Sequence, residues 1–138
     1  MTTVRHLNPE GMHRNPAFTQ AVVVEGPART IYVGGQNAVD ANGQIVGVGD
    51  LGAQSEQVFA NLTTVLAAAG ATLHDVIKWN IYTVQGQDVR PALEVFQRFW
   101  GREAAPPVIT GVFVAELAYP QFLVEIEAVA VVGASGGA

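Results

Sequence analysis

Apolar side chains in the middle of the chain recur with the spacing of one face of a helix. The residues that share this face are Val58, Leu62, Val65, Leu66 and Ala69. Asp50 precedes them with a side chain suited to capping a helix start, and Gly70 follows with the freedom to adopt a left-handed conformation. The pattern therefore predicts an amphipathic helix between Asp50 and Gly70.

A second helix is predicted from about Val89 to Arg102. Pro91 is compatible with this helix because proline is tolerated in the first turn. The apolar face is wide and consists of Ala92, Leu93, Phe96, Phe99 and Trp100. The simplest interpretation of these aromatic residues is that they belong to the core.

Other segments have the alternating period of strands. In residues 76–84, apolar and polar side chains alternate, and residues 108–114 and 122–132 are predicted as two further strands. The β-branched runs 21–24 and 30–33 flank a turn-prone Glu-Gly-Pro segment, so we expect them to pair as a hairpin.

The predicted order is strand, strand, helix, strand, helix, strand, strand, which indicates an α+β fold with a mixed sheet in a single domain, residues 1–138. The small residues 133–138 are expected to form a flexible tail. Two helices can cover only one face of the sheet, so the face that carries Leu123, Val129 and Val131 needs another cover. Charged residues make up 14% of the chain, where about 25% is usual. Both observations favour a homo-oligomer.

Charge and cysteine content limit the function classes. The net charge is −5 and the seven Lys and Arg residues are scattered, so we expect no nucleic-acid partner. Without cysteine the chain can form neither disulfides nor thiolate metal sites, and its three histidines lack metal-ligand spacing. No segment has the apolar run of a signal peptide or a membrane span, which favours a soluble cytoplasmic protein.

Two carboxylates are the main candidates for chemistry. Glu125 and Glu127 lie two residues apart in a predicted strand, so both point to the same face. Burial on a partly apolar face would favour a general acid or base, or a carboxylate that positions water. The alternative is a pair of solvated charges at a strand edge, and the residues themselves leave both open. Gly34-Gly35 could let a ligand approach the backbone, although the glycines alone favour a plain turn.

Four segments, taken in order, resemble the reactive intermediate deaminase (RidA, or YjgF) family. They are residues 31–36 (Ile-Tyr-Val-Gly-Gly-Gln), residues 50–70 with Gln54 and Asn61, residues 75–78 leading into Tyr82, and residues 124–130 (Val-Glu-Ile-Glu-Ala-Val-Ala). The resemblance covers nearly the whole chain, and its specific parts are the last segment and the segment of residues 50–70.

The resemblance implies a chorismate-mutase-like fold that assembles as a homotrimer, with pockets between neighbouring subunits. It also implies hydrolysis of enamines and imines such as 2-aminoacrylate to keto acids and ammonia, without a metal or organic cofactor. The glutamate that helps to position water matches Glu125. The substrate-binding positions match Phe18, Gly34, Gly35, Leu93, Ile109, Thr110 and Gly111.

The chain departs from the family pattern at the polar positions of that pocket. Ile109 stands where the family has an arginine that pairs with the substrate carboxylate. Phe18 replaces a tyrosine, Gly34 a serine and Leu93 an asparagine.

The chain thus keeps the overall family pattern but lacks the polar pocket residues, and three functions are compatible with this combination. The first is a protein with an apolar intersubunit pocket that binds or converts a small neutral or reactive nitrogen-containing metabolite. The second is an ordinary enamine or imine deaminase, a hydrolase, in which Arg14 or His13 supplies the missing cation. The third is a non-catalytic trimer that senses a ligand.

Overall fold

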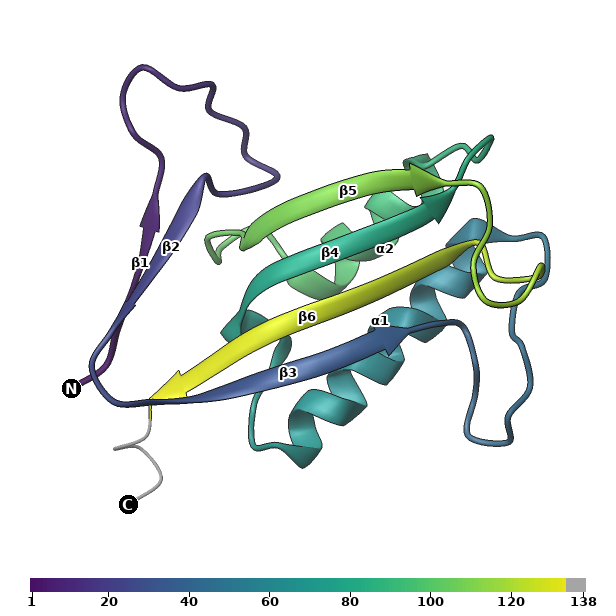
Figure 1. The fold of residues 1–138 in the computed structure, drawn as a ribbon, viewed down its shortest axis with the longest axis horizontal. Coiled ribbons are helices and arrows are strands. Elements are labelled where there is room, and N and C mark those ends of the chain that lie inside the picture. Colours follow the sequence, from purple (N-terminus) through teal and green to yellow (C-terminus); the bar gives the residue numbers. More distant parts are fainter. Residues whose placement is uncertain (134–138) are drawn as a thin grey trace.

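The computed structural model describes residues 1–133 and has two helices packed on one face of a four-stranded sheet (Figure 1). In chain order the elements are β1 (Thr3–Leu7), β2 (Ala21–Glu25), β3 (Ala28–Gln36), α1 (Leu51–Ala68), a short 3₁₀ helix (Leu73–Asp75), β4 (Val76–Val84), α2 (Arg90–Trp100), β5 (Val108–Val114) and β6 (Val124–Gly133). The predicted α+β class, with a mixed sheet and two helices on one face, is confirmed.

The sheet has the order β3-β6-β4-β5. Strand β4 runs parallel to β5, whereas β6 is antiparallel to both β3 and β4. A parallel pair needs a long crossover connection, and α2 provides it between β4 and β5. Strand β6 therefore lies inside the sheet, and β5 forms the edge beside α2.

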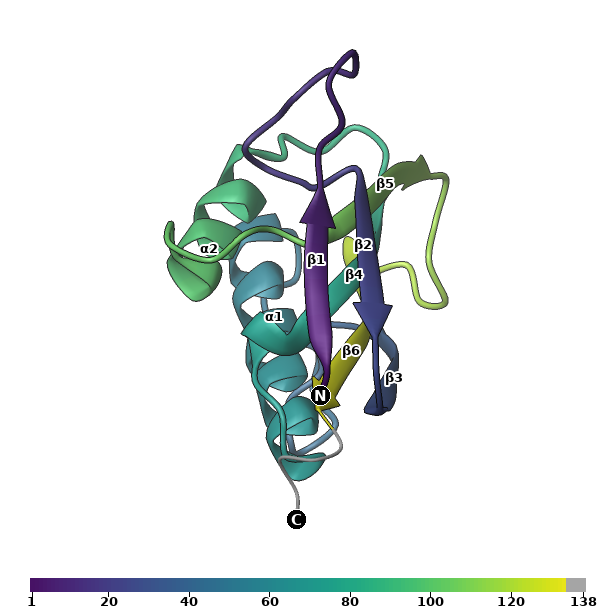
Figure 2. The same ribbon diagram turned by 90° about the vertical axis from the view of Figure 1, so that its left-hand side faces the viewer.

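The expected pairing of residues 21–24 with residues 30–33 is wrong. Strand β2 pairs with β1 as a separate two-stranded ribbon, and β3 pairs with β6 instead (Figure 2). The β-branched runs correctly indicate two strands, but local sequence does not determine which strand each one meets. Strand β1 was not predicted, because Arg5 and His6 interrupt its apolar pattern.

The predicted ends of α1 are confirmed. The Asp50 side chain accepts a hydrogen bond from the Ala53 amide at 3.0 Å, and Gly70 has a φ of 77°. Helix α2 ends at Trp100 rather than Arg102, because Gly101 leaves the helix with a φ of 83°. In the described part of the chain, neither helix is long and apolar enough to cross a membrane.

Strand β6 separates two environments. Val124, Ile126, Ala128 and Ala130 are buried against the helices, and the residues between them point to the opposite face. We call that opposite side the open face. Strand β6 begins at Val124, two residues later than predicted, and extends to Gly133. The remainder of the expected tail, residues 134–138, lies outside the described residues.

Candidate functional site

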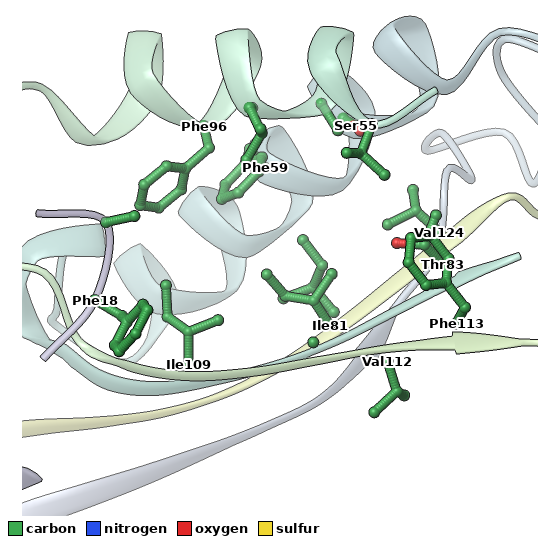
Figure 3. Close-up of a pocket in the computed structure, with 16 residues that line it drawn as sticks. Phe18, Ser55, Phe59, Ile81, Thr83, Phe96, Ile109, Val112, Phe113 and Val124 are labelled. Atoms are coloured by element: carbon green, nitrogen blue, oxygen red, sulfur yellow. The ribbon is translucent and has the colours of Figure 1, made fainter. Parts of the chain in front are cut away.

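A cavity of about 320 Å³ lies between α2 and the helix-facing side of the sheet (Figure 3). It extends from the N-terminal loop to the first turns of α1, and strand β5 forms its outer wall. Only two of its lining side chains are polar, those of Ser55 and Thr83, and none is charged. We call this cavity the apolar pocket.

Aromatic rings form much of the wall of the apolar pocket. Phe59 of α1 packs against Phe96 of α2 with ring centroids 5.9 Å apart, and against the buried Trp79 of β4 at 5.8 Å. Such contacts hold α1, α2 and the sheet at a fixed spacing. The wide apolar face of α2 thus contributes both to the core, as predicted, and to a cavity wall.

A buried threonine attaches the N-terminal loop to the start of β5. The Thr19 hydroxyl donates to the Pro106 carbonyl at 2.6 Å, and its amide donates to the Pro107 carbonyl at 3.1 Å. These bonds place Phe18, the preceding residue, beside Ile109 at one end of the apolar pocket (Figure 3). No local sequence pattern indicated this role for Thr19.

The opening of the apolar pocket is bordered by exposed apolar side chains. Leu93 of α2 is 52% exposed and Phe113 of β5 is 62% exposed. We call these two residues the pocket mouth. Apolar side chains left open beside a cavity are typical of binding and association surfaces.

The predicted substrate-binding positions fall into two groups. Phe18, Leu93, Ile109 and Gly111 all line the apolar pocket. Thr110 does not line it, because strand alternation points its exposed side chain to the open face. Ile109 packs against the core, so the position matched to the family arginine is part of an apolar wall.

The second group lies on the open face around Glu125. The Asn37 side chain donates to Glu125 Oε1 at 3.0 Å. Gly34 and Gly35 are exposed at the end of β3, and a Cβ atom on Gly35 would collide with the Glu125 carboxyl group. In one protomer, Glu125 and the apolar pocket are therefore separated by the thickness of the sheet.

Asn61 of α1 fixes the loop that carries Asn37. Its side-chain amide donates to the Asn37 carbonyl at 3.1 Å and to the Val39 carbonyl at 2.9 Å. Helix α1 thus positions a hydrogen-bond donor for Glu125 from the far side of the sheet. Asn61 belonged to the family-like segment, but its partners could not be identified from the sequence.

Glu127 lies in a second hollow, about 420 Å³ in volume, on the open face. Its Oε1 atom accepts hydrogen bonds of 2.8 Å from both Asn80 and Tyr82. The hydrogen bond from Asn80, followed by the smaller effect of the bond from Tyr82, lowers the pKa of Glu127. The hydrogen bond to Glu127 raises the pKa of Tyr82. The alternation in residues 76–84 correctly placed Asn80 and Tyr82 on one face, but the sequence did not show which carboxylate they meet.

Neither carboxylate is a solvated charge at a strand edge. Glu125 and Glu127 are both half-buried on a central strand, and both accept side-chain hydrogen bonds. His13 and Arg14, considered as substitute cations, are exposed on the N-terminal loop and do not line the apolar pocket. Among residues 1–133 there is no cluster of three or more potential metal ligands.

A family model and several known proteins each match most of the chain. A family model described as Endoribonuclease L-PSP matches residues 12–132. The chain is 33% identical over 114 residues to a RutC family protein of Pyrococcus abyssi, covering 82% of this chain and 84% of that protein. It is 33% identical over 118 residues to a 2-iminobutanoate/2-iminopropanoate deaminase of Rattus norvegicus, and this match covers 85% of this chain and 81% of that protein.

Among solved structures, the chain is similar to YyfB of Yersinia pestis, described as a protein of unknown function of the conserved Rid protein family. The TM-score is 0.77 at 38% sequence identity, and the match covers 94% of this chain and 98% of the other. The likeness therefore extends over nearly the whole chain.

Proposed function

Because the chain belongs to the endoribonuclease L-PSP (RidA/YjgF) family, we propose that its apolar pocket binds or converts a small neutral or reactive nitrogen-containing metabolite. The observation that carries the proposal is the lining of the pocket. No charged side chain lines it, and Ile109 stands where the family resemblance implies an arginine.

The energetics favour uncharged ligands. A carboxylate moved from water into such a lining would lose its hydration without gaining a partner, at a cost of several kcal/mol. A neutral ring that buries about 150 Å² of apolar surface gains about 4 kcal/mol, which corresponds to a Kd on the order of 1 mM. Hydrogen bonds and contacts with a neighbouring subunit would add to this.

We also propose that the complete site forms between subunits of a homotrimer. Glu125 and the apolar pocket lie on opposite faces of one sheet, so a ligand in the pocket can meet a Glu125 carboxylate only if another copy supplies it. A head-to-tail ring brings two different faces together at every interface. The exposed Leu93 and Phe113 at the pocket mouth, and Tyr32 on β3 with 80% exposure, are apolar surfaces that such contacts would cover.

If the pocket converts its ligand, hydrolysis of a carbon–nitrogen double bond is the reaction that suits Glu125. The carboxylate would accept a proton from water as its oxygen adds to the imine carbon. The carboxylate returns that proton to the imine nitrogen, which becomes an amine. Transfer of the remaining proton from the added hydroxyl to this nitrogen breaks the carbon–nitrogen bond, releases ammonia and leaves a carbonyl product. The relatives named 2-iminobutanoate/2-iminopropanoate deaminases favour this class of reaction.

The absence of the arginine determines which imines would be good substrates. A bidentate arginine–carboxylate pair contributes a few kcal/mol, so turnover of 2-aminoacrylate should be about a hundredfold below that of an arginine-bearing relative. Imines without a carboxylate should be the better substrates. Comparable turnover of 2-aminoacrylate would contradict this assignment and point to Arg14 or His13 as the cation.

The deciding experiment compares benzamide with benzoate, two ligands of similar shape and different charge, by titration calorimetry. We expect the wild-type protein to bind benzamide and to exclude benzoate. Ile109→Arg should reverse this preference, because it places a cation in the pocket. Preferential binding of benzoate by the wild-type protein would refute the neutral-ligand assignment.

Glu125→Gln tests the proposed role of the carboxylate. The substitution keeps the size of the side chain and its ability to accept a hydrogen bond from Asn37, but it removes the ionisable group. We expect unchanged assembly and thermal stability, with loss of imine turnover. If the trimer dissociates and no other property changes, Glu125 has a structural role only.

A further inference from the structure

The wall of the apolar pocket contains a buried polar atom whose hydrogen-bonding capacity the fold does not use. The hydroxyl oxygen of Ser55 is buried and has no hydrogen-bond partner among residues 1–133. Ser55 itself is 1% exposed and lines the apolar pocket. A buried hydroxyl without a partner destabilises a protein, so its presence in a cavity wall needs an explanation.

The same helix shows what a hydroxyl without a special role does. Thr63 donates to the Phe59 carbonyl at 2.8 Å, and Thr64 donates to the Ala60 carbonyl at 3.0 Å, each four residues earlier. Hydroxyls in helices commonly make this bond. Ser55 could make the equivalent bond to Leu51 and does not.

The lining of the apolar pocket contains a second hydroxyl, that of Thr83. In Figure 3, Ser55 and Thr83 lie toward the same end of the pocket as Val124, whereas Phe18, Ile109 and Phe96 lie toward the other end. Both hydroxyl-bearing residues are buried, and Val124 at the same end of the pocket is 2% exposed. The pocket therefore has an aromatic end and a buried polar end, which we call the hydroxyl recess.

A buried network holds the hydroxyl recess in place. Gln54, the residue before Ser55, is fully buried and donates to the Gly47 and Gln121 carbonyls at 3.1 and 2.8 Å. Its side-chain oxygen accepts from the Leu123 amide at 2.9 Å, next to Val124. These bonds tie the first turn of α1 to the chain entering β6, so the recess has little freedom to collapse.

We infer that Ser55 and Thr83 determine ligand specificity by hydrogen bonding to an uncharged polar group on an otherwise apolar, ring-sized ligand. Hydroxyl, carbonyl, amide and neutral imine groups fit this description, because a serine hydroxyl can both donate and accept. The inference rests on the proposed function and adds the orientation of the ligand: polar group at the recess, ring among Phe18, Phe96 and Ile109.

Phenol and toluene provide the test, because they share a ring and differ in one polar group. We expect wild-type protein to bind phenol about fivefold to tenfold more tightly than toluene in titrations monitored by NMR. Ser55→Ala should weaken phenol binding by most of that factor and leave toluene binding unchanged. Thr83→Val, which preserves shape, should reduce the preference for phenol in the same direction.

Thr63→Ala is the matched control. It also removes one hydroxyl from α1, but that hydroxyl is bonded to its own helix and does not line the pocket. Affinity for both probes should be unchanged. Because Ser55→Ala removes an unpartnered buried group, its unfolding midpoint should equal or exceed that of the wild-type protein, which separates a loss of binding from a loss of folding.

The outcomes distinguish this inference from the proposed function. Equal binding of phenol and toluene, with no effect of Ser55→Ala or Thr83→Val, overturns the specificity role and leaves the apolar pocket as a binding site. Failure of both probes to bind overturns the apolar pocket and the specificity role together. If Ser55→Ala loses phenol binding and keeps toluene binding, the result supports both the specificity role of Ser55 and the apolar pocket as a binding site.

Discussion

At the residue scale, Gly35 lies so close to Glu125 that there is no space for a side chain on Gly35. A methyl group on Gly35 would collide with the Glu125 carboxyl group, whereas a methyl group on Gly34 would meet nothing within 4 Å. Gly35→Ala should therefore displace the carboxylate, break its bond to Asn37 and lower the unfolding free energy by about 1 to 3 kcal/mol. Urea denaturation measures this effect.

Gly34→Ala is the control for that substitution. It should leave stability unchanged or raise it slightly, because alanine restricts the unfolded chain more than glycine does. If both variants lose the same stability, the effect comes from backbone conformation and not from contact with Glu125.

Glu127 makes stability depend on pH. Hydrogen bonds from Asn80 and Tyr82 hold its pKa below the ordinary value of 4.5. Its stabilising contribution is therefore fully present above the unfolded-state pKa and is lost as the pH falls through the lower, folded-state pKa. Glu127→Gln should flatten the decrease in unfolding free energy below about pH 4.5.

Denaturation series between about pH 6 and pH 3 would measure that slope. Glu116→Gln provides a matched control, since it removes an exposed glutamate that makes none of these hydrogen bonds. A Glu127→Gln protein whose stability still falls as steeply as that of the wild type would show that Asn80 and Tyr82 do not stabilise the charged carboxylate.

At the scale of elements, Gln54 connects α1 to two loops through three side-chain hydrogen bonds. Gln54→Leu keeps the approximate volume but leaves the Gln121 carbonyl and the Leu123 amide without a partner. The Gly47 carbonyl, in contrast, keeps its bond from the Asp50 amide. We expect a loss of about 2 kcal/mol or more in unfolding free energy, because each buried unsatisfied group costs about 1 to 3 kcal/mol. Chemical denaturation measures the change.

Gln57→Leu, one turn away, serves as the comparison. The Gln57 side chain donates one hydrogen bond, to Asn61 on the same helix. Its replacement should cost less than about 1 kcal/mol. Similar losses in the two variants would contradict the role assigned to Gln54.

The difference between local and distant interactions also explains what the sequence could predict. Helix α1 was predictable because its cap, its apolar spacing and its terminal glycine are all encoded in the continuous segment from Asp50 to Gly70. The partner of β2 was not predictable, because β1 has no clear strand pattern and the choice between β1 and β3 depends on tertiary contacts.

The same limit applies to the site. Sequence resemblance identified Phe18, Leu93, Ile109 and Gly111, which the structure brings together around one pocket. It did not identify Ser55, Thr19 or Asn37, because their roles depend on residues far away in the chain. A buried polar residue on an apolar helix face was the one available signal for Ser55.

At the scale of the whole molecule, exposed apolar residues predict self-association. We expect light scattering to give three times the chain mass of 14.5 kDa. Phe113→Asp should lower that mass, because it places a charge on a side chain that we expect a neighbouring copy to cover.

Val48→Asp changes an apolar residue of similar exposure, 65%, on the loop before α1. It should leave the mass unchanged. A wild-type protein that has the mass of a single chain at micromolar concentration would rule out the trimer.

The separation of Glu125 from the apolar pocket by one sheet has a genetic consequence. If the proposed trimer forms and its shared site is catalytic, Glu125→Gln and the pocket-filling Gly111→Leu would each inactivate every site of a uniform trimer. Co-expressed in one cell, the two mutant chains would mix, and about one quarter of the sites would combine an intact pocket with an intact Glu125 from the next chain. Two alleles that are each null would then complement each other, whereas a double mutant paired with a null allele would not.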